Sequence, residues 1–220
     1  ESNISNASAY DKMTLLLEEI DKKYNYLDNR SLKSIILDEK PSVAIQQLHK
    51  VHQYNCIMVG TSKQENSWEM GAISQSILLT VPTSILVIPP KTELIFPNNI
   101  SVLIEKKEQS NFDLLSAFNR FVAYDNIFIN FVFFAKNKKI MEEEKALIEE
   151  YQSFFESNFT FTFIVEAVQT YMNFFKYIEE TYCAAAVIPW DENSIFHESF
   201  MQDKCGKFPC SPKIAVLFSK

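Results

Sequence analysis

The most constraining feature of the sequence is a series of short apolar runs that alternate with segments of helical periodicity. Runs that are apolar over their whole length are typical of strands buried on both faces of a parallel sheet. Strands that alternate with helices also favour parallel pairing, because each crossover needs room for a helix. The sequence therefore predicts an α/β fold, with strands at residues 56–59, 84–88, 100–104, 126–134, 159–165, 183–188 and 213–218.

The segments between these runs have the spacing of amphipathic helices, with apolar residues recurring every three or four positions. The predicted helices cover residues 13–24, 42–53, 70–78, 112–122, 140–155 and 169–181. Pro41 suits the first turn of the second helix, and Asn66 and Glu69 have capping-box spacing before the third. A further strand is predicted at residues 31–37, and the polar residues 1–11 are expected to be a disordered lead.

Part of this order of elements occurs twice along the chain. A helix, a strand, a loop and a second strand follow one another over residues 42–88 and again over residues 169–218. The spacing between the two strands is nearly the same in both copies. An internal repeat of this kind predicts two half-units, residues 1–97 and 98–220, packed as an intramolecular pseudo-dimer or assembled further into a homodimer.

Charge and hydropathy exclude several classes of function. The net charge is −7 and both predicted half-units are mildly acidic, which argues against a nucleic-acid or anionic membrane surface as partner. No apolar run is long enough for a transmembrane helix. The first residues lack the basic and apolar regions of a signal peptide, so a cytoplasmic location is expected.

Side chains with catalytic or metal-binding chemistry form no recognised motif in this sequence. Cys56 and Cys183 lie in apolar runs, which predicts buried, reduced thiols. Cys205 and Cys210 lack two further ligands at zinc spacing, and a disulfide between them would need an oxidising compartment. His197 could act together with a cysteine nucleophile, but the sequence shows no activating context for such a pair. We therefore expect no catalytic residue and no metal site.

Three stretches of the first half-unit resemble the carboxy-terminal part of a universal stress protein domain. They are residues 55–61 (NCIMVGT), 71–74 (GAIS) and 81–89 (VPTSILVIP). Domains of that family end with a strand closing in Met-Gly-Thr, a glycine-containing loop, a helix and a strand reading like Pro-Val-Leu-Val-Val-Pro. The resemblance covers about residues 12–90. Over residues 98–220 it depends on the order of elements and the strand ends.

The resemblance implies flavodoxin-like or Rossmann-like half-units, each with a parallel five-stranded sheet of strand order 3-2-1-4-5. The second half-unit supplies five predicted strands. The first supplies only the last three, so it is predicted to lack its first two strands. Either an incomplete amino terminus or strands from a neighbouring chain would account for this gap.

The resemblance also locates a possible phosphate site in the first half-unit. ATP-binding members have Gly, two residues, Gly, nine residues, Gly and then Ser or Thr. Here Gly60 and Gly71 match, whereas Lys63 replaces the second glycine, only seven residues separate Lys63 from Gly71, and Ala72 replaces the hydroxyl residue. If nucleotide binds, the resemblance implies phosphate contacts from Gly60, Thr61, Lys63 and Gly71, near a helix amino terminus.

The second half-unit departs further from the family pattern. Glu105 aligns with the family's aspartate after the first strand, but Trp190 stands near the position of the glycine and threonine, and Gly206 is the single glycine of the loop. No phosphate cradle is recognisable there. The aromatic residues of this loop, among them Trp190, Phe196 and Phe208, would form an interaction patch if exposed or a lid over the strand ends if folded in.

These observations predict a non-catalytic stress-response or regulatory protein that acts through protein–protein association and needs no cofactor. Two alternatives stay open. The first is an adenine-nucleotide-binding protein that holds ATP or AMP with loop 60–74. The second is an α/β enzyme of another family with its site in loop 190–212.

Overall fold

The structure, a computed structural model, describes a subset of the chain, and every structural statement below refers to that subset. The described residues are 2–24, 33, 35–61, 68–69, 71–89, 99–105, 128–134, 139, 142, 145, 166–168, 170–190, 194, 196–198, 207–208 and 214–219. The chain divides into two compact units, Glu1–Ala44 and Ile45–Lys220. The predicted boundary at residue 97 falls outside the described residues and stays a prediction.

The first unit corrects two predictions. Helix α1 spans Ser2–Tyr24, so the polar residues expected to be disordered are helical from Ser2 onward. Extending an existing helix costs less free energy than nucleating one, so the apolar turns after Met13 can carry the polar residues before them. The predicted strand at 31–37 is wrong for its described residues, because Lys33 and residues 35–37 adopt no regular structure. A strand needs a neighbour to pair with, and local propensity alone does not provide one.

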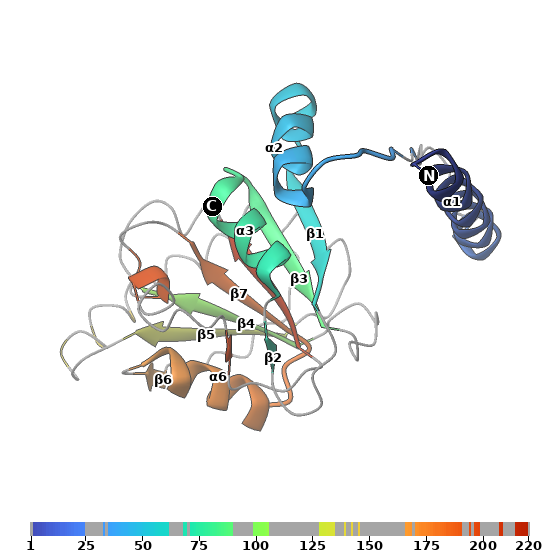
Figure 1. Ribbon diagram of the computed structural model, residues 1–220. Coiled ribbons are helices and arrows are strands. Elements are labelled where there is room, and N and C mark those ends of the chain that lie inside the picture. Colours follow the sequence, from blue (N-terminus) through green and yellow to red (C-terminus); the bar gives the residue numbers. More distant parts are fainter. Residues whose placement is uncertain are drawn as a thin grey trace. The chain divides into compact units, whose positions relative to one another are not determined.

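The second unit is built on one mixed seven-stranded sheet with the order β1-β3-β9-β7-β4-β5-β6 (Figure 1). Every pairing is parallel except that of β3 with β9, which is antiparallel. The predicted α/β fold is confirmed, although one sheet replaces the two separate sheets that were expected. The strands are β1 (Cys56–Gly60), β3 (Ser84–Ile88), β4 (Asn99–Ile104), β5 (Phe128–Phe134), β6 (Glu166–Val168), β7 (Ala185–Pro189) and β9 (Ala215–Ser219).

We call the antiparallel pairing of β3 with β9 the joint of the sheet. The strand pairs on its two sides have the same register. Strand β1 pairs with β3 from first residue to last, and β7 pairs with β9 in the same way. At the joint, Leu86 of β3 lies opposite Leu217 of β9. The flanking pairs place Ile85 opposite Phe218 and Val87 opposite Val216. Two strand pairs of identical register therefore meet symmetrically about Leu86 and Leu217.

Two helices of this unit position the residues discussed below. Helix α6 (Tyr171–Glu180) agrees with the predicted helix, and Thr170 caps it by accepting a hydrogen bond from the Asn173 backbone N–H at 3.2 Å. Helix α3 (Ala72–Thr80) begins later than predicted, with Gly71 as its N-cap.

The predicted capping box before α3 is wrong. Glu69 belongs to a short strand, β2 (Trp68–Glu69), which pairs antiparallel with β8 (Lys207–Phe208). Backbone pairing with a segment far along the chain thus sets the start of α3, in place of a local side-chain cap.

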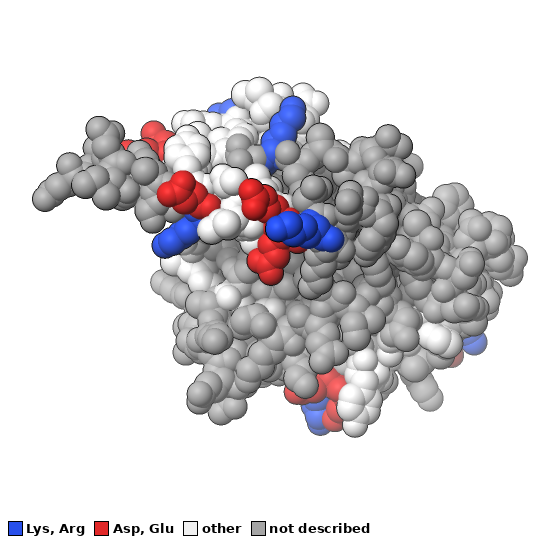
Figure 2. All heavy atoms as spheres, turned by 90° about the vertical axis from the view of Figure 1, so that its right-hand side faces the viewer, with Lys and Arg blue, Asp and Glu red and all other residues white. Residues whose placement is uncertain are grey.

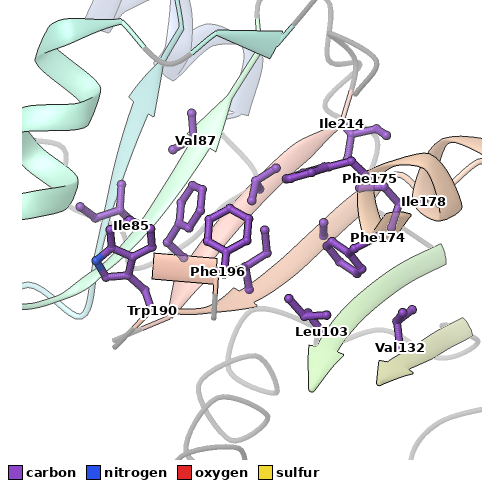
Figure 3. Close-up of a cluster of buried hydrophobic side chains, with 14 of the residues drawn as sticks. Ile85, Val87, Leu103, Val132, Phe174, Phe175, Ile178, Trp190, Phe196 and Ile214 are labelled. Carbon is purple, nitrogen blue, oxygen red and sulfur yellow. The ribbon is translucent and has the colours of Figure 1, made fainter. Parts of the chain in front are cut away.

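The core lies between the sheet and helices α3 and α6 (Figure 3). On α6, Phe174, Phe175 and Ile178 recur at helical spacing and are fully buried. Two apolar residues of other helices are instead exposed, Ile73 of α3 at 56% and Val51 of helix α2 (Pro41–His52) at 75%. Both belong to the region around β1, the edge strand of the described sheet, where fewer elements are available to cover apolar side chains.

Several predicted elements lie wholly or mostly outside the described residues. These are the helix at 112–122, most of the helix at 140–155, the strand at 159–165 and the cysteines Cys205 and Cys210. Strand β6 begins directly after the predicted strand, at Glu166. In the described part of the chain, no helix is long and apolar enough to cross a membrane.

Candidate functional site

In open α/β sheets, ligands bind beyond the carboxyl ends of parallel strands, and two such edges exist here. At the first, Gly60 ends β1 and the Thr61 N–H donates to the Ile88 carbonyl at 3.1 Å, which extends the β1–β3 ladder. The buried Ser74 hydroxyl, in the first turn of α3, donates to the Gly60 carbonyl at 3.2 Å. The structure therefore places Gly60, Thr61 and the amino end of α3 together.

Gly60 and Gly71 leave the backbone open at this edge. Among the described residues, no atom lies within 4 Å of a Cβ added at Gly60, so their packing does not require a glycine there. Gly71 makes no side-chain capping bond to the first N–H groups of α3. Such an edge could hold an anion through backbone donors. Lys63, the predicted source of positive charge, lies outside the described residues, so the predicted set stays a prediction.

The second edge lies where β4 and β7 run side by side. From β4 the chain proceeds to β5 and β6 on one side, then returns to β7 and β9 on the other. The strand order therefore reverses between β4 and β7, which is the switch point where this fold forms its ligand crevice. Glu105 follows β4 and Trp190 follows β7, so these two residues flank the crevice.

A short segment of the chain covers this switch point. The Phe196 backbone N–H donates to the Glu105 Oε1 atom at 2.9 Å. The Ser194 side chain accepts from the His197 N–H at 2.9 Å, and its carbonyl accepts from the Glu198 N–H at 3.1 Å. Residues 196–198 thus form one helical turn that is capped by Ser194 and attached to the end of β4.

The ring of Phe196 is only 1% exposed and lies among other aromatic rings (Figure 3). Its centroid lies 6.0 Å from that of Phe175, 5.8 Å from that of Phe218 and 6.1 Å from that of Trp190. Trp190 is itself 6% exposed. The sequence left two possibilities for this aromatic loop, an exposed interaction patch or a lid over the strand ends. Trp190 and Phe196 are buried, as expected for a lid. For Phe208 the structure describes the backbone, and the prediction for its side chain stays a prediction.

The loops at the two edges are joined to each other. Strand β2 lies in the loop that leaves β1, and β8 lies in the loop that leaves β7. Their antiparallel pairing places Trp68 opposite Phe208 and Glu69 opposite Lys207 in register. Neither loop signals this pairing in its own sequence, which is why sequence reasoning missed it.

A buried polar cluster, also missed from the sequence, lies at the opposite, amino ends of β4 and β5. The Asn130 side chain donates to Asn99 Oδ1 at 2.6 Å, and the Asn99 amide donates to the Thr181 carbonyl at 3.1 Å. The Ser101 hydroxyl lies 2.8 Å from the Cys183 sulfur. Ser101, Asn130 and Cys183 are all buried. The available signal was the presence of Asn and Ser inside otherwise apolar runs.

The two described thiols differ in environment. Cys183 is buried, as predicted, whereas Cys56 is only half-buried at the start of β1. Desolvation raises the pKa of the Cys56 thiol above 9.0, and backbone hydrogen bonds from Leu86 and Ile57 lower it to a smaller extent. A raised pKa disfavours the reactive thiolate. Among the residues that the structure covers, no group of His, Cys, Asp and Glu could hold a metal ion.

The described surface carries charges of both signs. Figure 2 shows basic as well as acidic side chains among the described residues in that view. This mixture agrees with the net charge of −7. A nucleic-acid surface would instead gather Lys and Arg.

Comparison with known proteins identifies the fold. No protein-family model and no curated sequence matches the chain. Among solved structures, a universal stress protein from Archaeoglobus fulgidus is 12% identical with a TM-score of 0.62, over 100% of this chain and 79% of that one. A candidate universal stress protein from Pseudomonas aeruginosa is 9% identical with a TM-score of 0.59, over 94% and 78%. The chain therefore has the Rossmann-like fold of universal stress proteins, and the predicted resemblance is confirmed at the level of fold.

Proposed function

We propose that this chain is a tandem member of the universal stress proteins, a cytoplasmic stress-response regulator that acts through association with other proteins and not through catalysis. The observation that carries this proposal is the combination of a symmetric joint between two strand pairs and a switch point filled by the chain itself. The first feature indicates a built-in dimer. The second removes the usual ligand crevice from one of its halves.

The register supports the tandem arrangement. The registers are compatible with a two-fold axis between Leu86 and Leu217, because such an axis would map β1 and β3 onto β7 and β9 and the flanking antiparallel pairs onto one another. An isologous contact has this property, because each partner presents the same surface to the other. On the far side of Leu217, the sheet order β6-β5-β4-β7-β9 supports the proposal, because it has the pattern 3-2-1-4-5 that the resemblance implies for a half-unit.

The chemistry at the two edges supports a binding role. At the first edge the described groups are backbone donors and the Ser74 hydroxyl, which is already bonded to Gly60. At the second edge the Glu105 carboxylate is bonded to the Phe196 backbone. No described side chain at either edge is arranged as a nucleophile beside a base, the arrangement that covalent catalysis requires.

A second candidate function is adenine-nucleotide binding at the first edge. The open space at Gly60 and the uncapped start of α3 favour it, because both would let backbone N–H groups approach phosphate. Gly60, Thr61, Lys63 and Gly71 would then contact ATP or AMP. Nothing in the described part of loop 190–212 favours the enzyme alternative, since Trp190 and Phe196 are packed into the core.

A thermal-shift titration with ATP and AMP, with and without magnesium, separates these functions. A ligand that binds only the folded state raises its stability by mass action. No shift at millimolar nucleotide supports the regulator, whereas a saturable shift lost in Gly71→Glu supports the nucleotide protein. Gly71→Ser is the matched control, because serine is a good N-cap and adds no charge. Turnover of ATP that is lost in Gly71→Glu would contradict a non-catalytic role.

A further inference from the structure

We propose that Ser194 and residues 196–198 form a built-in plug that keeps the crevice between β4 and β7 closed, with the Glu105 carboxylate as its latch. The plug places one aromatic ring at the position where this fold admits a ligand. The inference depends on the strand order and on the contacts of these residues. It therefore holds whether or not the first edge binds nucleotide.

The latch consists of a charged group bonded to the backbone. Glu105 follows an apolar strand directly and is partly buried, a costly place for a carboxylate without a partner. Its Oε1 atom accepts the Phe196 N–H at 2.9 Å. That N–H lies in the first turn of the helical segment, where backbone N–H groups precede the first intrahelical bonds and side chains commonly accept from them. A hydrogen bond to a charged group is about twice as strong as a neutral one, so this contact holds the turn over β4.

The ring explains why the turn closes the crevice. Phe196 contacts rings from α6, β9 and the end of β7, namely Phe175, Phe218 and Trp190. Ser194 accepts hydrogen bonds from the N–H groups of His197 and Glu198, which holds the turn together. His197 packs its ring on Trp190 at 4.9 Å. The Glu105 bond and the aromatic cluster therefore both hold the turn in the closed state, and each can be altered by substitution.

Glu105→Ala tests the latch, and Glu105→Gln is its matched control. The glutamine keeps a carbonyl oxygen that can accept the same N–H, whereas alanine removes the acceptor. Both variants are made in the full chain with Trp68→Phe, which leaves Trp190 as the single tryptophan. Hydrogen exchange of the 196–198 amides and acrylamide quenching of Trp190 fluorescence are then measured.

The plug predicts a local effect. In Glu105→Ala, the 196–198 amides should exchange about tenfold faster or more, as expected for loss of a hydrogen bond to a charged group. Trp190 should become more accessible to acrylamide, while the amides of β7 keep their protection. Glu105→Gln should stay close to the parent. Unchanged exchange and quenching in Glu105→Ala would overturn the proposal, as would an equal loss of protection in β7.

The parent protein supplies a second test that needs no variant to fold. If the turn is a plug, its amides exchange through a local opening, with a lower free energy than the β7 amides under native conditions. Low urea concentrations should therefore leave exchange at 196–198 unchanged while exchange at β7 accelerates. Exchange at 196–198 that accelerates together with that of β7 would show a fixed part of the core and refute the plug.

Discussion

Asparagine at position 130 has an unusual place, inside an apolar strand and 4% exposed. It is stable there because its amide donates to Asn99, whose own amide donates to the Thr181 carbonyl. A buried polar group without such partners would cost free energy. This chain of bonds links the start of β4 to β5 and to the turn before β7, so it favours one register of the three strands.

Replacing Asn130 by Leu should lower the free energy of unfolding by about 1–3 kcal/mol, because the partly buried Asn99 oxygen loses its amide donor and keeps only the long contact of 3.7 Å from the Cys183 thiol. Urea unfolding measures the change. Asn173→Leu, at an exposed position of α6, is the control and should shift stability by less than about 0.5 kcal/mol. Equal effects of the two substitutions would show that the buried bond contributes nothing.

The raised pKa of Cys56 gives a prediction with a definite sign. An unfolded cysteine begins to ionise below pH 9, whereas the folded thiol stays protonated because desolvation raises its pKa. Native Cys56 should therefore react with iodoacetamide more slowly at pH 8.5 than it does in urea. Mass spectrometry of the alkylated peptide measures both rates.

The same shift affects stability only in alkaline solution. Below the pKa of the unfolded thiol both states are protonated, so Cys56 adds no pH dependence. Above about pH 9 the unfolded state releases its proton first, and the free energy of unfolding falls as the pH rises. Cys56→Ala should make this alkaline decline shallower. An identical decline in the variant would contradict the raised pKa.

At the scale of elements, the cap of α6 offers a clean measurement. Thr170 is exposed and accepts the Asn173 N–H, so its hydroxyl contributes mainly through this bond. Thr170→Ala should cost about 1 kcal/mol of stability, while Thr170→Ser keeps the acceptor and should stay within a few tenths. The melting temperatures of the parent, Thr170→Ala and Thr170→Ser proteins measure this difference. Equal values for the Ala and Ser variants would mean that the cap is not formed.

Elements that depend on their own residues could be predicted from the sequence. The strands at 56–59, 84–88 and 100–104 and helix α6 follow from apolar runs and helical spacing, and the structure confirms them. Residues 31–37 have the same local pattern but form no strand in their described part, because pairing is a tertiary property. The antiparallel joint at Leu86 and Leu217 was not predicted for that reason.

The candidate site residues likewise divide into those that local sequence could place and those whose role depends on a distant partner. Gly60, Thr61 and Gly71 could be placed at a strand end and a helix start from local motifs. The role of Glu105 could not, because its partner is a backbone N–H far along the chain. No pattern in the sequence around Phe196 shows that its ring would fill the switch point.

At the scale of the whole molecule, the joint makes one sheet and one core from the two proposed half-units. Leu78 and Val87 on one side and Phe175 and Phe218 on the other belong to the same buried cluster. Removing either side would expose the apolar surface of the other. Residues 45–220 should therefore unfold in a single cooperative step.

Hydrogen exchange across a urea series tests this cooperativity. The amides of β3 and of β7 should lose protection at the same urea concentration, because neither strand pair keeps a core of its own. In the Trp68→Phe protein, fluorescence of Trp190 should report the same midpoint. Loss of β3 protection at clearly lower urea than β7 would instead show two separable half-units.

The pairing of β2 with β8 has a consequence for how this protein can change over generations. Trp68–Glu69 and Lys207–Phe208 share one ladder, so an insertion or deletion inside either two-residue strand changes the register of this pairing. The two strands are therefore constrained together, and anyone grafting β2 onto another scaffold must transplant β8 with it.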